Sequence, residues 1–461
     1  MNRSTNGAVY ALISRLIPGM NLPGEDKALL ASTAGSLVVR LLGMSASFAM
    51  GVLLARQLNP DGFGVYGIVI ALALMLSVIA QFGLPTIATR EVSVAFAEQR
   101  WGTLRGYLWR FGAIVTASSA GLAIVWACMA ILFPKLTGAP TANLIGSMLV
   151  PLFALTVLVS AELRALDRIV AGQALEVLVR PALMCVILYI AYSWEGGLSA
   201  PVAVGVNVLA STVTIIAGLV LLRSVMPLAA SNSTVEQPRR WFKPALALAS
   251  VDVLKQLDVT YGMLLLGVLS SKAEAGYFRV ALSTIIFVST PLSIVNVVLA
   301  PTLARLAAAG DRGRLQRLMA ISALAMFATA IVALAAILLI GKPLIALVFG
   351  ASYEPAWLPL VLLTCAQAIN GFFGVGWVLL SMSGGERRLT ASFVLSVGAS
   401  IVAAIPLTMV AGAAGAAGAA IIGALIQNLF AWRSVHLHSS LECSAAGILL
   451  RTRGVGRHLR R

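Results

Sequence analysis

Charge is what this 461-residue chain lacks most. Charged residues make up 11% of it, with only 17 acids, whereas a soluble protein carries about 25%. Cysteine and histidine are scarce too: the four cysteines have no CxxC partner, and the three histidines lie in a basic C-terminal tail. These residues provide neither a disulfide framework nor metal-ligand spacing, so we expect no metal and no cofactor.

Long polar connections are also missing. The longest connections between apolar runs span residues 86–110 and 223–244, and neither contains a nucleophile–base set or a phosphate-binding glycine loop. A membrane-embedded enzyme of glycan assembly needs a larger extramembrane part to hold its chemistry. The sequence therefore disfavours that class, and we expect no enzymatic activity.

Apolar sequence dominates instead. Hydrophobic residues make up 59% of the chain and the mean hydropathy is +0.95. The apolar runs are continuous rather than alternating with period two, which favours helices over a β-barrel. We therefore predict an all-α integral membrane protein with twelve spans. They cover about residues 29–55, 64–86, 111–133, 143–162, 170–192, 201–222, 245–269, 276–300, 318–340, 355–380, 391–411 and 417–433.

Lysine and arginine are distributed unevenly over the two sides of this arrangement. Of the 33 basic residues, 25 lie in one set of alternate segments, which includes both termini, and four lie in the other set. Positive charge marks the cytoplasmic side, so we predict a multi-pass membrane protein with both termini in the cytoplasm. The net charge of +16 then reflects topology and contact with anionic membrane lipids, and we expect no nucleic-acid binding.

The seventh predicted span, 245–269, contains three charges. Asp252, Lys255 and Asp258 follow one another at steps of three residues, so they share an arc of about 120° on a helix. Charged side chains inside a membrane are costly and usually functional. We interpret Asp252 and Asp258 as ion-coupling acids. The alternative is that they only compensate Lys255 and lock two helices together.

Three arginines and one glutamate also lie well inside predicted spans. Arg40, Arg180 and Arg279, together with Lys255, are candidates for binding an anionic substrate. Arg40 is the strongest because it has no acid one turn away. Arg180 is four residues from Glu176, a further candidate coupling acid, so a structural salt bridge is an equal alternative there. Arg279 lies close to the outer interface, where a long side chain can snorkel.

A weak internal repeat divides the chain into two lobes. At an offset of 212 residues, GVLLARQLNPDGFGVY (51–66) matches MLLLGVLSSKAEAGYF (263–278), with Gly64 equivalent to Gly276 and Arg40 to Asp252. The even helix count predicts parallel repeats around a central cavity. The expected domains are a cytoplasmic N-terminal segment (1–27), an N-lobe (28–222), a cytoplasmic linker (223–244), a C-lobe (245–433) and a basic cytoplasmic tail (434–461).

Several stretches resemble one transporter family. VLLARQLNPDGFGVYGIVIAL, QFGLPTIATREV, LDVTYGMLLLGVLSSKAEAGYFRVA, APTLARLAAAGDRGRLQRL and LIALVFGASYEPAWLPLVLL are similar to Wzx-type polysaccharide flippases. These belong to the multidrug/oligosaccharidyl-lipid/polysaccharide exporter superfamily. The likeness covers about residues 28–433, and Lys255 matches no motif of the family.

The resemblance implies a protein of the bacterial inner membrane that works by alternating access with two six-helix lobes. The implied substrate is an undecaprenyl-diphosphate-linked oligosaccharide for O-antigen, capsule or exopolysaccharide. We expect membrane lipids and a coupling ion, proton or sodium, as further partners, and possible contact with the polysaccharide polymerase machinery. The alternative within transport is an exporter of small cations or drugs, whose cavity should be acidic. Four intramembrane cations against three acids leave that alternative open.

Overall fold

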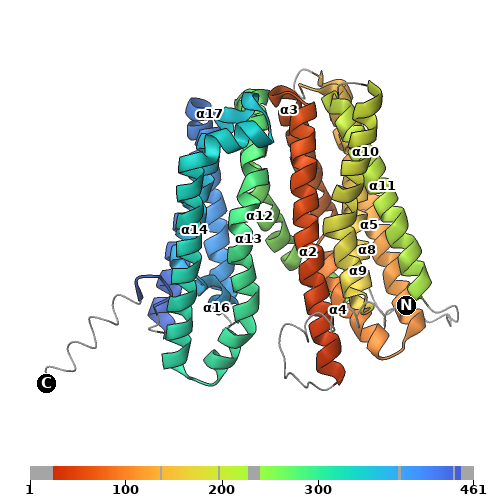
Figure 1. The fold of residues 1–461 in the computed structure, drawn as a ribbon. Helices are drawn as coiled ribbons and strands as arrows, with labels where there is room; N and C mark the ends of the chain where they lie inside the picture. The colour runs from red at the N-terminus through yellow and green to blue at the C-terminus, as the bar shows by residue number, and fades with distance from the viewer. Residues whose placement is uncertain are drawn as a thin grey trace. The chain divides into compact units, whose positions relative to one another are not determined.

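The protein is described by a computed structural model that covers residues 24–134, 138–195, 198–226, 239–382, 386–439 and 442–447. Within these ranges every regular element is a helix (Figure 1). The predicted N-terminal segment lies outside the described residues up to position 23, as do residues 227–238 of the predicted linker and residues 448–461 of the basic tail.

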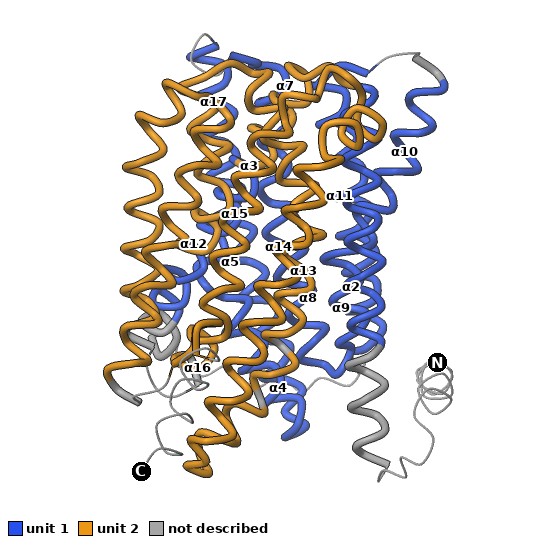
Figure 2. The backbone as a smooth tube through the Cα atoms, turned by 60° about the vertical axis from the view of Figure 1, so that its left-hand side comes forward, with its two compact units in different colours: residues 1–57, 72–253 blue, residues 58–71, 254–461 orange. Residues whose placement is uncertain are grey.

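The chain forms two compact units, residues 1–57 with 72–253 and residues 58–71 with 254–461 (Figure 2). Unit 1 contains most of the first half of the sequence and unit 2 contains most of the second half. The boundary between the units differs from the middle of the sequence at two places. The first part of one helix of the first half, 58–71, is counted in unit 2, and the chain passes from unit 1 to unit 2 at 253–254, inside another helix.

The helices of the first half begin with α2 (Gly24–Gln57) and α3 (Pro60–Gln81). They continue with α4 (Leu84–Ala97), α5 (Trp101–Leu132), α7 (Pro140–Ser147), α8 (Leu149–Ala165), α9 (Ile169–Ala174), the π-helical turn η1 (Leu175–Val179), α10 (Arg180–Glu195) and α11 (Ala200–Val225). Unit 1 has a hydrophobic core formed mainly by α3, α4, α5, α8 and α11, which includes the almost fully buried Phe111, Leu158 and Leu163.

The second half begins with α12 (Arg239–Leu269), α13 (Lys272–Ala308) and α14 (Arg312–Val348). The short 3₁₀ turn η2 (Ala351–Ala356), α15 (Trp357–Phe373), α16 (Gly376–Met382) and α17 (Glu386–Ser439) follow. Helix α17 is two helices joined at a break, because Ala411 and Gly412 leave the helical conformation. In Figure 1, α13 and α14 run side by side as a hairpin, and α15 packs on both α14 and α17.

The helices account for all twelve predicted spans. Among the described residues, ten stretches are long and apolar enough to cross a membrane. The last, Arg388–Leu437, contains the break in α17 and is therefore two spans. Helix α12 is the twelfth, since its 31 residues are long enough to cross although they include the three predicted charges. The observed helices extend past the predicted ends, as in α14, because helices continue beyond the apolar core of a bilayer.

One helix was not predicted. Helix α4 lies in the connection 86–110, after a reversal at Phe82 and Gly83, whose φ angles are 48° and 70°. A Cβ at Gly83 would lie 2.6 Å from the carbonyl oxygen of Ala245 and 2.7 Å from the amide nitrogen of Ala249, both on α12. Glycine is therefore required here both by the backbone angle and by the close helix.

The chain after α17 returns to unit 2. The backbone of Glu442 exchanges hydrogen bonds with the side chain of Gln316, and its carboxylate accepts from Trp432 at 2.6 Å. The next residue, Cys443, is buried beside Gly374 and Gly376 at the break between α15 and α16. Burial raises the pKa of its thiol to about 12, so this cysteine is a packing residue.

Candidate functional site

A polar cavity lies inside unit 2. It has a volume of about 210 Å³ and is enclosed by α12, α13, α15 and both parts of α17. Its apolar wall includes Phe278, Leu282 and Leu363. Its polar lining consists of Asp258, Tyr261, Gln367, Asn370, Ser396 and Gln427. Such groups are rare in an apolar bundle, and together they make this cavity the candidate site.

Helical spacing brings the polar groups to one place. On α12, Asp258 and Tyr261 are three residues apart and so share a face, as do Gln367 and Asn370 on α15. The amide of Asn428 on α17 donates to Asn370 at 2.7 Å, and Asn370 donates to Gln367 at 3.3 Å. This chain of amides fixes α15 against α17 and holds the cavity open.

The other side of the cavity is held by hydroxyl groups. Ser396 donates to the carbonyl of Gly423 at 2.9 Å, and Ser400 hydrogen-bonds Tyr261. A side chain at Gly423 would overlap the Ser400 hydroxyl. The two parts of α17 therefore approach closely, and Ser400 holds the hydroxyl of Tyr261 at this wall of the cavity.

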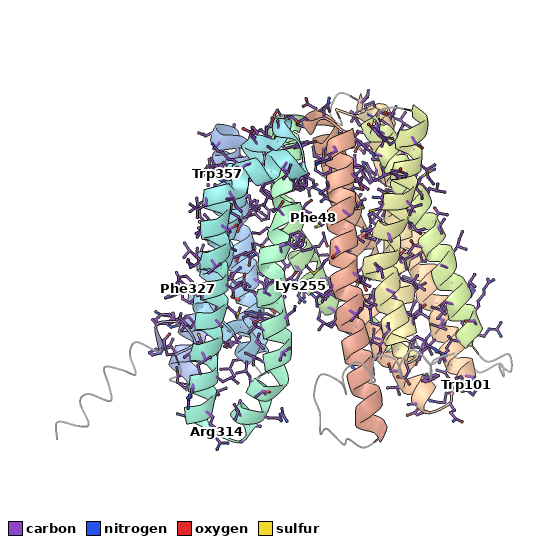
Figure 3. All side chains as sticks on the ribbon, viewed as in Figure 1. Phe48, Trp101, Lys255, Arg314, Phe327 and Trp357 are labelled. Carbon is purple, nitrogen blue, oxygen red and sulfur yellow. The ribbon has the colours of Figure 1, made fainter. Side chains whose placement is uncertain are left out.

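Lys255 and Asp258 lie on one face of α12 but form no ion pair with each other in the described part of the chain. Lys255 is exposed. In Figure 3, Trp357 and Arg314 lie near the upper and lower ends of unit 2, and Lys255 lies between them in height. Among the described residues, no salt bridge joins Lys255 to Asp258. Compensation of Lys255 by a direct bond therefore does not explain Asp258, whose carboxylate faces neutral amides and hydroxyls. Asp252 is half-buried and belongs to unit 1.

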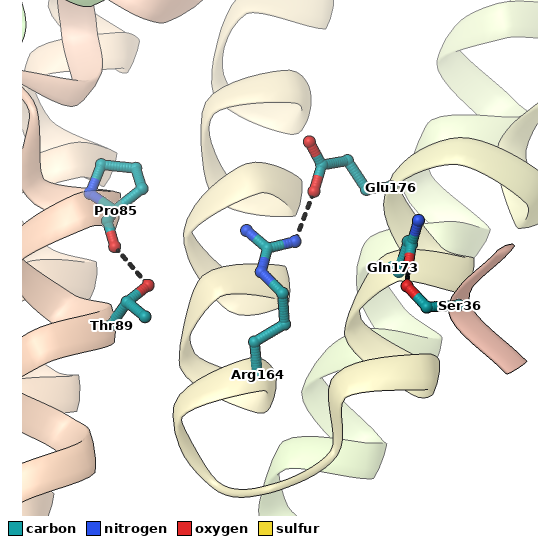
Figure 4. A network of polar contacts seen from close by, with 6 residues as sticks. All are labelled: Ser36, Pro85, Thr89, Arg164, Gln173 and Glu176. Atoms are coloured by element: carbon teal, nitrogen blue, oxygen red, sulfur yellow. Dashed lines mark hydrogen bonds and ion pairs between the residues drawn. The ribbon is translucent and has the colours of Figure 1, made fainter. Parts of the chain in front are cut away.

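A second polar network lies in unit 1. The carboxylate of Glu176 accepts a hydrogen bond from Arg164 at 2.6 Å (Figure 4). One turn earlier, Gln173 accepts a hydrogen bond from Ser36 of α2. Glu176 thus pairs with Arg164 of α8, whereas the sequence offered a salt bridge to Arg180 as one of two alternatives. The guanidinium of Arg180 stands 4.6 Å from the centre of the Phe153 ring, a cation–π contact.

The remaining predicted cations differ in their surroundings. Arg40 lies near the midpoint of α2 and is exposed, and no ion pair with a described residue reaches it. Arg279 is half-buried on α13: its stem lies over Gly67 of α3, and its charge is close to Tyr66. Arg279 is thus packed against protein within unit 2 rather than extended into an interface.

The cavity therefore combines one predicted residue, Asp258, with partners that were not predicted. The amides Gln367, Asn370 and Gln427 were missed, although two amides three residues apart in an apolar span are a detectable signal. A buried acid was missed as well. Glu162 on α8 is 2% exposed, and its Oε1 has no hydrogen-bond partner among the described residues.

Comparison with known proteins places the chain in a family. A family model described as "Polysaccharide biosynthesis protein" matches residues 29–307. The chain belongs to this family. The comparison with curated proteins finds no match.

Solved structures give the fold of this member of the polysaccharide biosynthesis family. The lipid II flippase MurJ, in an inward closed conformation, has a TM-score of 0.69 at 14% identity, over 88% of this chain and 87% of MurJ. An inward-facing multidrug resistance MATE transporter of the MOP superfamily has a TM-score of 0.68 at 13% identity, over 87% of this chain and 98% of the transporter. At such identities the likeness establishes the fold, and with the family match it confirms the superfamily expected from the sequence.

Proposed function

We propose that this protein is a flippase for undecaprenyl-diphosphate-linked oligosaccharides. It would move repeat units of O-antigen, capsule or exopolysaccharide across the bacterial inner membrane by alternating access. The family match over residues 29–307 carries this proposal, and the MurJ-like fold supports it. The guanidinium of Arg40 on α2 is exposed and forms no ion pair with any described residue. It suits a diphosphate, because a guanidinium can donate to two phosphate oxygens at once. Lys255, Arg180 and Arg279 are the other candidate cations.

Coupling of transport to an ion is assigned to Asp258. Its carboxylate is exposed on α12 and lines the cavity among amides and hydroxyls. These neutral groups can help to hold a proton or a sodium ion at the carboxylate but do not neutralise its charge. Glu176 already accepts a hydrogen bond from Arg164, and Asp252 lies outside the cavity. Both fit this role less well than Asp258.

One observation favours a second candidate, an exporter of small organic cations. Among the described residues, the lining of the cavity in unit 2 includes one acid and no base, which is chemistry that prefers a cation. The two functions differ in what moves through the protein. A small-molecule exporter would lower the accumulation of cationic dyes, whereas a flippase would leave dye accumulation unchanged.

Reconstitution tests the proposed function. Purified protein in liposomes that contain a fluorescent undecaprenyl-diphosphate-linked oligosaccharide should expose the inner-leaflet lipid to a quencher added outside. Protein-free liposomes and liposomes with the Arg40→Ala variant are the controls. Equal quenching in all three preparations, together with transport of a cationic dye, would reject the flippase function and support the function of a small-cation exporter.

The predicted orientation is tested separately. Reporter fusions at Asn59, Ala139 and Ser352 should be active outside the cytoplasm, and fusions after Arg312 or Arg461 inside it, because lysine and arginine concentrate on the cytoplasmic side. Two reporters are fused in turn at each position, one active only in the cytoplasm and one active only outside it. Opposite results from the two reporters at one position then serve as its control. A C-terminus outside the cytoplasm would contradict both the even helix count and the parallel repeat.

A further inference from the structure

An apolar hollow lies on the surface of unit 1. It has a volume of about 420 Å³ and is bounded by α5, α8 and α11, with the end of α7 at one side. Ile124 and Met148, which line it, are 63% and 59% exposed, so the hollow opens outwards. The rest of its α5 wall consists of alanines, among them Ala120 and Ala123. No long side chain of that wall therefore fills the space.

The hollow lies within the membrane-spanning part of unit 1. Helix α5 is itself a stretch long and apolar enough to cross a membrane, and the stretches Pro140–Ala165 and Ala200–Val225 contain α8 and α11. The lining residues lie several positions inside each of these stretches. At that depth hydrocarbon chains take the place of water, so the occupant that suits this hollow is a lipid chain.

The same face of α5 carries a cation and an aromatic ring one turn apart. Arg105 and Trp109 are both exposed, Trp109 at 75%. Because a helix turns by 100° per residue, both lie within an arc of about 60° that also contains Ala120 and Ala123. Tryptophan is typical of the membrane–water interface, and an arginine close to it meets the lipid headgroups. This face of α5 thus leads from headgroup-binding residues to the hollow.

Arg105 has no acid to neutralise it among the described residues, because no ion pair reaches it. Other exposed arginines on and between α4 and α5 do have acids. Arg90 pairs with Glu91 at 3.8 Å, and Arg100 pairs with Glu98. A guanidinium that keeps its full charge at a membrane surface attracts an anionic headgroup and can donate to two of its phosphate oxygens.

The distances fit a single phospholipid. Helix α5 rises about 16 Å between Trp109 and Ala120, the nearest residue of the hollow on this helix. Half of the hydrocarbon core of a bilayer is about 15 Å thick, which is the reach of one acyl chain. The path between them is open at Gly112, where a Cβ would meet no atom within 4 Å. A chain whose headgroup lies at Arg105 therefore ends in the hollow.

We propose that this face of unit 1, from Arg105 to the hollow, binds one anionic phospholipid. Its phosphate lies on Arg105, Trp109 stands beside its glycerol region, and one acyl chain enters the hollow between α5, α8 and α11. The headgroup belongs to the leaflet at the beginning of α5, which the predicted topology makes the cytoplasmic one. This lipid is a bound partner rather than a transported substrate, so the inference does not depend on the proposed function.

A photoactivatable phosphatidylglycerol tests the site. The full-length protein is placed in bilayers of phosphatidylcholine that contain a trace of the probe, which carries a diazirine at the end of one acyl chain. The hollow should be labelled roughly fivefold more than the exposed residues Val332 and Leu339 of α14, because one basic residue near an anionic headgroup contributes about that factor. A phosphatidylcholine probe with the same chain should show no preference. Equal labelling of the hollow and α14 by the anionic probe would overturn the proposal.

Removal of the charge tests the headgroup position. Arg105→Gln should lower labelling of the hollow by the anionic probe to the level of the phosphatidylcholine probe, a loss of roughly fivefold. Arg314→Gln is the matched control, since Arg314 is an exposed arginine of α14, and it should leave the labelling unchanged. Full labelling of the hollow in Arg105→Gln would show that Arg105 does not hold the headgroup and would refute the site.

Filling the hollow tests the chain position while the charge stays in place. Ala123→Phe should remove the labelling of the hollow. Gly121→Phe is the matched control, because Gly121 is exposed on a different face of α5 and a Cβ there meets no atom within 4 Å. Labelling of the hollow that survives Ala123→Phe would place the chain elsewhere and reject the proposal. The two variants change different residues, so misfolding of one leaves the other test in force.

Discussion

Replacing Arg40 with alanine is expected to reduce the affinity for a diphosphate-linked substrate roughly ten- to a hundred-fold. The loss corresponds to about 1.5–3 kcal/mol for a hydrogen bond to a charged group. Arg40→Lys should keep part of the export, because an ammonium supplies the charge without the forked geometry. Binding of the fluorescent substrate by purified protein, with export in cells, measures both effects.

The control is an arginine that has no such role. Arg314 is exposed and pairs with Asp311 at 3.3 Å, an interaction worth about 0–1 kcal/mol. Arg314→Ala should therefore leave export within twofold of the wild type. A structural Arg40 that pairs with Asp252 predicts a different result. Arg40→Ala would lower the amount of folded protein, and adding Asp252→Ala would restore both protein and export. That restoration would end the substrate-binding role.

Asp258→Asn is expected to abolish the dependence of export on the ion gradient and to slow export at least tenfold. The amide keeps the size of the side chain in the cavity but can neither take up a proton nor neutralise a sodium ion. Export measured over a range of pH and sodium concentration, with the protein level, tests this expectation. Glu354→Gln is the matched control, since Glu354 is an exposed acid of η2 outside the cavity.

A variant that exports normally under all these conditions would remove Asp258 from coupling. It would leave the carboxylate as a packing group of the amide network. A variant that loses protein along with export calls for Asp258→Glu, which keeps the charge. Recovery of export by glutamate but not by asparagine would then restore the coupling role.

The sequence predicted those features that depend on one helix at a time. Span number, fold class and the shared face of Lys255 and Asp258 follow from hydropathy and a period of 3.6 residues. The partners of Asp258 do not, because Gln367 and Gln427 reach the cavity from helices that are distant in the chain. Their approach depends on tertiary packing, about which a periodic pattern carries no information.

Local backbone geometry explains the other differences. The pairing of Glu176 with Arg164 arises because the chain reverses at Asp167, whose φ is 58°, and returns through α9 to the π-helical turn η1. Spacing rules for α-helices favour Arg180 and cannot include that reversal. Helix α4 was not predicted because the chain reverses just before it, at Gly83, which has a left-handed conformation. Spacing rules do not include that reversal either.

Within unit 2, the hydroxyl of Tyr353 in η2 donates a hydrogen bond to the carbonyl of Leu58, and the two residues are 295 positions apart. A ribosome adds about 5–20 residues per second, so Leu58 waits roughly 15–60 s for its partner. Until then, the apolar face of α3 that carries Phe63 and Tyr66 is covered only by lipid or by the insertion machinery. Assembly of unit 2 cannot finish before nearly four-fifths of the chain has been made, so a truncated chain that ends before η2 should be a substrate for membrane proteases.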